Sequence, residues 1–131
     1  MTNAALLELA EQAMQYAYAP YSGFKVGAAL VGKSGTVYTG CNVENASFGV
    51  TNCAERTALF KAVSEGEREF TRIAIVGGKD GVITDYCYPC GICRQALSEF
   101  TDIRFEVILK DGADNIISTT LNDLLPESFN L

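Results

Sequence analysis

The fold class follows from residues 53–110, which read CAERTALFKAVSEGEREFTRIAIVGGKDGVITDYCYPCGICRQALSEFTDIRFEVILK. Segments 53–64 and 90–100 have the residue spacing of helices, whereas the apolar runs at 72–78 and 104–110 are typical of buried strands. Because helices and strands alternate along this stretch, it predicts βαβ units with right-handed crossovers.

The segments on either side add a helix and further strands. Residues 3–18 carry an apolar stripe at helical spacing, and Pro20 would end that helix. Residues 24–31 and 36–41 flank a Gly-Lys-Ser-Gly turn and predict a β-hairpin, and residues 116–120 predict a fifth strand. The sequence therefore predicts an α/β sandwich built on one mixed sheet of five strands.

The composition limits both the size of the fold and its chemistry. The chain has 131 residues, of which 48% are apolar, with five cysteines and no histidine. At about 100–200 residues per domain, residues 1–131 are expected to form a single domain. The absence of histidine excludes the Ser-His-Asp triad, the Cys-His nucleophile pair and imidazole metal sites. Acid–base chemistry near neutral pH must then use a perturbed carboxylate, lysine, tyrosine or cysteine.

The chain has 16 acidic and 10 basic residues, and the basic residues are scattered along the sequence. Both features disfavour nucleic acid as a partner, because a protein that binds it usually clusters lysine and arginine on one face. A small neutral ligand is easier to accommodate. The N-terminus has no signal-peptide pattern, and the apolar stretches fall short of the roughly 18 residues that a membrane helix needs. We expect a soluble, cytoplasmic protein with no membrane partner, whose cysteines serve metal binding or catalysis rather than disulfides.

Three cysteines are spaced so that they can hold one metal ion. Cys90 and Cys93 are three residues apart and share a helical face. Cys53 and Cys90 each begin a predicted helix, where the partial positive charge favours a thiolate. Three thiolates would bind zinc and leave its fourth position open to water, as in catalytic sites. Glu55, in the first turn after Cys53, is placed to exchange a proton with that water.

Two other cysteines leave an alternative open. Cys87 forms a second, overlapping C-x-x-C pair, so that a closed, structural zinc site with four cysteines is conceivable. Against that alternative, Cys87 precedes Pro89 and lies off the helix, and a closed site would give Glu55 nothing to act on. We favour the open site. Cys41, at a strand end, is expected to be a small buried apolar residue rather than a ligand.

Charge counting gives Arg56 a role beside the cysteines. Three thiolates on a divalent ion leave the cluster with a charge of about -1, which weakens the pull of the ion on its water. A guanidinium that donates a hydrogen bond to sulfur would offset the excess. Gln95, two residues after Cys93, could donate a similar hydrogen bond.

The spacing Cys53-x-Glu55 with Pro89-Cys90-x-x-Cys93 is similar to that of the zinc deaminase superfamily, in an all-cysteine form. More closely, the chain resembles the cytidine deaminases of the small, homotetrameric class. The resemblance covers nearly the whole chain in the correct order. It runs through YAPYS at 18–22, FKVGAA at 24–29, GCNVENAS at 40–47, CAERTA at 53–58, PCGICRQ at 89–95 and LLP at 124–126.

This resemblance implies a three-layer α-β-α sandwich and one zinc ion per chain, held by the same three cysteines with Glu55 as proton shuttle. The implied reaction is the hydrolytic deamination of cytidine and 2′-deoxycytidine to the uridines plus ammonia, in pyrimidine salvage. It also implies a homotetramer with shared active sites, in which Phe48 and Phe129 reach the site of a neighbouring subunit.

The resemblance further assigns the substrate contacts. Asn42 and Glu44 would form hydrogen bonds with the ribose hydroxyls, Phe24 would pack against the base, and the backbone N–H of Ala54 would hold the base carbonyl. The residue chemistry agrees, since a carboxylate and an amide on one short segment suit a vicinal diol. Without the resemblance, residues 42–45 would be interpreted as a polar turn after a strand.

Three other functions remain as alternatives. The first is that the chain is an enzyme of the same superfamily that acts on another aminated heterocycle, such as blasticidin S, although the CAER motif at 53–56 with Asn42 and Glu44 favours a ribonucleoside. A polynucleotide-editing deaminase would need a basic, aromatic-lined groove, which this acidic chain lacks. The non-enzymatic alternative is a structural zinc module that Cys87 closes.

Overall fold

The computed structural model describes all residues 1–131 and contains one five-stranded sheet in the order β2-β1-β3-β4-β5. The parallel pair is β3 with β4, and the other neighbours are antiparallel, so the expected mixed sheet is confirmed. The strands are β1 (Phe24–Gly32), β2 (Val37–Cys41), β3 (Phe70–Lys79), β4 (Glu106–Lys110) and β5 (Ile116–Thr120).

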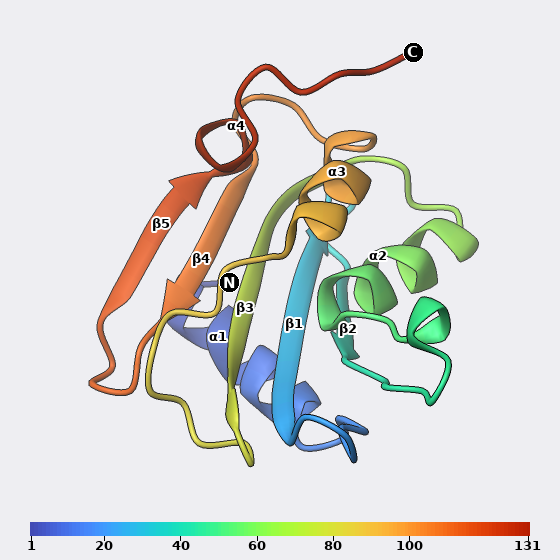
Figure 1. The fold of residues 1–131 in the computed structure, drawn as a ribbon. Helices are drawn as coiled ribbons and strands as arrows, with labels where there is room; N and C mark the ends of the chain where they lie inside the picture. The colour runs from blue at the N-terminus through green and yellow to red at the C-terminus, as the bar shows by residue number, and fades with distance from the viewer.

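Helices cover both faces of this sheet, as Figure 1 shows. The helix α1 lies behind the sheet in that view, and α2 and α3 lie in front of it. The helices are α1 (Asn3–Met14), α2 (Ala54–Ser64), α3 (Gly91–Ser98) and the short α4 (Leu121–Leu124), with a 3-10 turn at Phe48–Val50. None of them has the length and apolar character needed to cross a bilayer.

The core divides into two clusters because successive residues of a strand point to opposite faces of a sheet. In β3, Ile73 and Ile75 pack toward α2 and α3, whereas Ala74 and Val76 pack toward α1. Ala28 and Ala29 of β1 divide between the two clusters in the same way. This alternation produces the α-β-α sandwich, since each face must be covered by a helix.

Two glycines let helices approach the sheet closely, one on each side. A Cβ atom on Gly27 of β1 would collide with the Ala10 carbonyl of α1. On Gly40 of β2, a Cβ atom would lie 2.6 Å from the backbone nitrogen of Ala58 in α2. The second contact positions the candidate site, because it sets α2 directly against the sheet.

The first helix is shorter than the sequence predicts. It ends at Met14 rather than near residue 18, and the N–H groups of residues 15–17 bond to carbonyls three residues earlier. Beyond this turn, Tyr18 pairs with Val43, and the Tyr18 N–H donates to the Asn42 carbonyl at 3.0 Å. This long-range pairing outweighs the local helical preference, and it brings residues 18–23 beside the segment that carries Asn42 and Glu44.

Candidate active site

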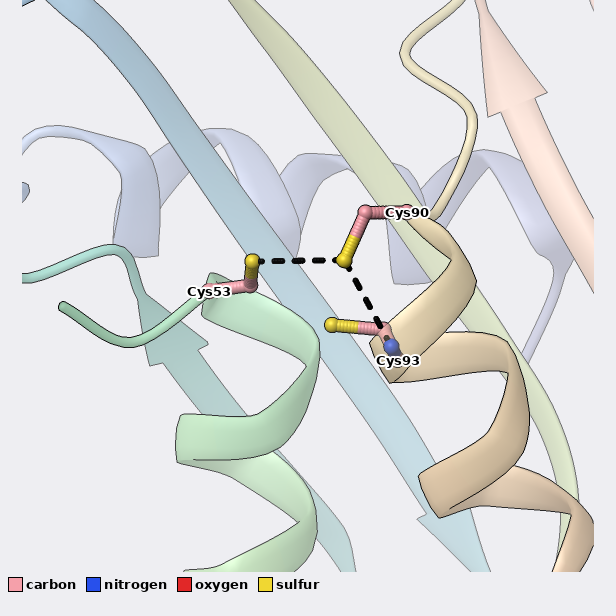
Figure 2. Close-up of side chains that lie close together, drawn as sticks. All are labelled: Cys53, Cys90 and Cys93. Carbon is pink, nitrogen blue, oxygen red and sulfur yellow. Dashed lines mark hydrogen bonds between the residues drawn. The ribbon is translucent and has the colours of Figure 1, made fainter. Parts of the chain in front are cut away.

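Three cysteine sulfurs meet where α2 and α3 begin. Cys53 caps the N-terminus of α2, Cys90 caps that of α3, and Cys93 lies in the first turn of α3. Figure 2 shows the three side chains converging, and their sulfurs all lie within 4.8 Å of one another. The Cys53 and Cys90 sulfurs are 3.7 Å apart. Two thiolates bound tetrahedrally to one zinc at about 2.3 Å would be about 3.8 Å apart, so the cluster fits that metal.

The other two cysteines lie outside this cluster. The Cys87 sulfur packs near Gly77 of β3, and it is absent from the group of side chains able to hold an ion. Burial raises the pKa of the Cys87 thiol to about 12, which keeps it protonated. Cys41 is half-buried at the end of β2, and burial raises the pKa of its thiol as well. The geometry therefore favours a three-sulfur site over a closed site of four.

Glu55 is the buried carboxyl group beside the cluster. It lies in the first turn of α2 and is 4% exposed. Burial, with a smaller contribution from the nearby Cys53 sulfur, raises the pKa of the Glu55 carboxyl to about 7. A carboxyl group with a pKa near neutrality can both take up and release a proton at the working pH.

Arg56 follows Glu55 and contacts the cluster from another side. Its Nη2 donates a hydrogen bond to the Cys53 sulfur at 3.4 Å. Hydrogen bonds from Cys93 and Arg56 hold the pKa of the Cys53 thiol well below its usual range. The Arg56 Nε is buried without a hydrogen-bond partner. An unpaired buried donor is costly, and the hydrogen bond from Nη2 to the Cys53 sulfur offsets part of that cost.

Gln95 makes a different contact from the one expected. Its Nε2 donates to the Phe129 carbonyl at 3.4 Å, and it forms no hydrogen bond with a sulfur. The side chain lies on the face of α3 that meets the C-terminal tail. Spacing from Cys93 alone could not distinguish these two directions.

A cleft of about 290 Å³ opens beside the cluster and is lined by three of the six remaining candidate residues. Phe24, Asn42 and Glu44 line it together with Glu55. A second hollow of similar volume continues from it and includes Phe48. The cleft has further lining residues to which sequence reasoning assigned no substrate contact, although the YAPYS and FKVGAA motifs include Ser22 and Val26 and Cys87 was considered as a zinc ligand. These further lining residues are Ser22, Val26, Thr51, Asn52, Cys87 and Tyr88.

Two of the polar residues that line the cleft, Asn42 and Glu44, are held by the backbone around the start of β1. Asn42 accepts a hydrogen bond from the Val26 N–H at 2.8 Å and donates one to the Phe24 carbonyl at 2.7 Å. Its amide thus positions the start of β1 and keeps one N–H free. Glu44 accepts hydrogen bonds from the Ser22 hydroxyl and from the backbone N–H groups of Ser22 and Tyr21, and these bonds, the hydroxyl foremost, hold the pKa of its carboxyl low.

The remaining candidates occupy three different environments. Ala54 is buried at the start of α2, where first-turn N–H groups have no partner within the helix. Phe48 is 84% exposed on the rim of the second hollow. Phe129 is 68% exposed on the C-terminal tail and does not line the cleft of its own chain. The structure thus brings Ala54 to the site and leaves the two phenylalanines facing outward.

Comparison with known proteins identifies relatives along nearly the full chain. The family model for the cytidine and deoxycytidylate deaminase zinc-binding region matches residues 1–110. The cytidine deaminase of Sporosarcina psychrophila is 46% identical over 124 residues, covering 95% of this chain and 88% of that protein. That of Halalkalibacterium halodurans is 46% identical over 129 residues, covering 98% and 95%.

Solved structures agree with this match. The crystal structure of cytidine deaminase from Burkholderia pseudomallei has a TM-score of 0.89 and 50% identity, covering 98% of this chain and all of that one. The cytidine deaminase structure from Mycobacterium tuberculosis has a TM-score of 0.84 and 38% identity, covering 100% and 99%. Sequence and fold thus agree on one family with a zinc-binding region, and the chain belongs to the cytidine and deoxycytidylate deaminase family.

Proposed function

We propose that this chain, acting as one domain over residues 1–131, deaminates cytidine and 2′-deoxycytidine to uridine and 2′-deoxyuridine with release of ammonia. The observation that carries the proposal is the buried Glu55 carboxyl, which borders both a three-sulfur cluster and a cleft. The relatives named cytidine deaminase support the choice of substrate.

Cys53, Cys90 and Cys93 would hold one zinc ion per chain. Zinc supplies Lewis acidity and lowers the pKa of a water molecule. The three sulfurs contribute negative charge, and Arg56 contributes the positive charge that offsets part of it. Because these sulfurs must stay reduced, we place the protein in the cytoplasm, where its products would enter pyrimidine salvage.

Glu55 is the proton carrier in this proposal. The water oxygen bonds to C4 of the cytosine ring while the Glu55 carboxylate takes one proton from the water and gives it to N3. Glu55 then takes the proton of the new C4 hydroxyl and gives it to the exocyclic nitrogen, so that the C4–N bond breaks, ammonia leaves and the C4 carbonyl of uridine forms. A pKa of about 7 supports both directions of transfer, because neither protonation state is strongly preferred near neutral pH.

The cleft residues orient the nucleoside. Phe24 supplies an aromatic surface for the base, and the free N–H of Ala54 suits its carbonyl oxygen. The Glu44 carboxylate and the free N–H of Asn42 suit sugar hydroxyl groups. The cleft contains two carboxyl groups and no lysine or arginine, so it suits an uncharged nucleoside better than a polynucleotide.

We further propose that the chain forms a homotetramer with shared active sites. Phe48 and Phe129 are large apolar side chains with exposed fractions of 84% and 68%. Aromatic side chains are enriched in the parts of a surface that another subunit covers. Phe48 borders the hollow that continues from the cleft, so a neighbouring subunit placed there would help to enclose the substrate.

The test is an ultraviolet assay of cytidine loss with the zinc-loaded protein, run beside blasticidin S and single-stranded DNA. We expect turnover of cytidine only, loss of turnover after treatment with a chelator, and recovery with added zinc. Glu55→Gln should lower kcat by about two to four orders of magnitude while zinc stays at about one ion per chain.

Glu65→Gln is the matched control for this substitution. Glu65 caps the opposite, exposed end of α2, so its loss should leave turnover unchanged. A zinc-loaded Glu55→Gln protein with the wild-type rate would refute the assigned proton carrier. Turnover of blasticidin S or DNA in place of cytidine would refute the substrate.

A further inference from the structure

The loop that precedes β1, residues 19–23, holds the Glu44 carboxylate with three hydrogen-bond donors. One carboxylate oxygen accepts from the N–H groups of Tyr21 at 2.9 Å and Ser22 at 3.1 Å. The other oxygen accepts from the Ser22 hydroxyl. Charge-assisted hydrogen bonds of this kind are strong and directional. Glu44 is therefore held as an anion in one orientation at the edge of the cleft.

The Ser22 hydroxyl also connects Glu44 to the start of β1. While it donates to Glu44, it accepts a hydrogen bond from the Phe24 N–H at 3.0 Å. Both Glu44 and Phe24 line the cleft. One hydroxyl thus sets the position of the proposed sugar contact relative to the proposed base contact.

Lys79, at the end of β3, fixes the same loop from outside the cleft. Its Nζ donates to the Ser22 carbonyl at 2.6 Å, and the neighbouring Asp80 N–H donates to the Gly23 carbonyl at 2.7 Å. Gly23 has a φ of 71°, and a Cβ atom there would lie 2.6 Å from the Lys79 Nζ. The positive charge of Lys79 also favours the ionised form of Glu44 and lowers the pKa of that carboxyl.

We propose that Ser22 and Lys79 are positioning residues for Glu44, and that through it they determine how strongly the site selects nucleosides with sugar hydroxyl groups. The inference rests on the proposed function, in which Glu44 accepts a hydrogen bond from such a hydroxyl. Neither residue acts on the reacting ring atoms. Their loss should therefore weaken binding of the sugar, because the carboxylate is no longer preorganised, and leave the chemical step intact.

Steady-state kinetics of Ser22→Ala and Lys79→Met with cytidine, 2′-deoxycytidine and 2′,3′-dideoxycytidine test this proposal. For cytidine, KM should rise about tenfold in Ser22→Ala, which loses a hydrogen bond to a charged group. The rise should be about threefold in Lys79→Met, because the lysine is exposed. We expect kcat to stay within about twofold, and Lys79→Arg to restore the wild-type KM. For the dideoxynucleoside, which lacks both the 2′- and the 3′-hydroxyl groups that Glu44 would bind, neither variant should change kcat/KM.

The chain contains a matched control at the opposite end of the sheet. The Ser34 hydroxyl donates to the Glu67 carboxylate and accepts from the N–H two residues later, as the Ser22 hydroxyl does. The adjacent Lys33 bonds Glu69 at 3.3 Å. Ser34→Ala and Lys33→Met remove equivalent interactions away from the cleft, so they should leave KM unchanged for all three nucleosides.

The outcomes separate this inference from the function on which it rests. An equal loss of kcat/KM for cytidine and dideoxycytidine would show a general structural effect and overturn the positioning role. Unchanged KM values in both variants would overturn it as well. Equal KM values of the wild-type protein for the two nucleosides would show that Glu44 makes no sugar contact. If the wild-type protein deaminates none of the three, the proposed function itself fails.

Discussion

Glu55 and Arg56 are consecutive residues with opposite effects on the same cysteine cluster. Neighbouring residues of a helix point about 100° apart, so the two side chains reach the sulfurs from different sides. Glu55 is buried, and the pKa of its carboxyl is raised to about 7. Arg56 donates to the Cys53 sulfur at 3.4 Å and brings a positive charge to a group of thiolates. Proton transfer and charge balance are thus carried by separate residues of one helical turn.

Substitution of Arg56 tests the charge argument at this scale. Arg56→Gln keeps a hydrogen-bond donor but removes the positive charge, so the three sulfurs would weaken the acidity of the metal centre. We expect zinc to stay at about one ion per chain and kcat to fall about 10–100-fold. Arg104→Gln is the control, because that side chain is exposed and pairs only with Asp102. The measurements are the zinc content and the initial rates of both variants. An unchanged kcat in Arg56→Gln would refute the charge argument.

The sequence could predict these residues because they are local to two helix starts. Cys53 and Glu55 lie within one turn of α2, and Cys90 and Cys93 lie within one turn of α3. Local spacing on a helix therefore carries most of the information about the cluster. That the two helix starts meet was an inference from the resemblance and the metal chemistry, and the structure brings the sulfurs together.

At the scale of elements, local spacing is a poorer guide, as the differences in α1 and α3 show. The early end of α1 at Met14 comes from the pairing of Tyr18 with Val43, which no local pattern reveals. The Gln95 side chain donates to the Phe129 carbonyl rather than to a sulfur, and no local pattern reveals this contact with the C-terminal tail either. By contrast, all five strands were predicted, because each is an apolar or alternating run that reports its own burial.

Arg94 of α3 shows how elements are joined around the site. Its Nε donates to the Pro89 carbonyl at 2.7 Å, directly before the first cysteine of the C-x-x-C pair. Its Nη1 donates to the Leu124 carbonyl at 2.8 Å, where α4 ends. One half-buried guanidinium therefore links the loop before α3, the helix itself and the C-terminal segment.

We expect Arg94→Met to loosen this connection and with it the metal site. Loss of a charged donor from two carbonyls should lower the free energy of unfolding by about 2 kcal/mol. Zinc should pass faster to a competing chelator, because the loop that ends at Pro89 and Cys90 is less restrained. Thermal unfolding and the chelator-transfer rate measure the two effects, with Arg104→Met as control. A variant with wild-type stability and zinc retention would contradict this linking role.

At the scale of the whole molecule, two exposed phenylalanines bear on the proposal that subunits share active sites. The hollow that includes Phe48 continues the cleft outward, and Phe48 is 84% exposed there. The tail carries Phe129 away from the cleft of its own chain, although Gln95 and Arg94 anchor the segment that leads to it. An anchored tail that presents an exposed aromatic ring is suited to a contact with another subunit.

Complementation between two defective variants tests whether active sites are shared in this way. Phe129→Ala should impair every site that depends on a neighbour's tail, and Glu55→Gln should inactivate the site of its own chain. When the two are dissociated, mixed in equal amounts and reassembled, random assortment gives about one quarter of the sites an intact Glu55 and an intact Phe129 from a neighbour. We therefore expect about a quarter of the wild-type activity, well above the mean of the two parent proteins.

The control mixes Phe129→Ala with the double variant that carries both Glu55→Gln and Phe129→Ala. This mixture should give no recovery. An activity equal to the mean of the two parent proteins would show that each chain completes its own site. In that case no site would have gained an intact Phe129 from a neighbouring chain.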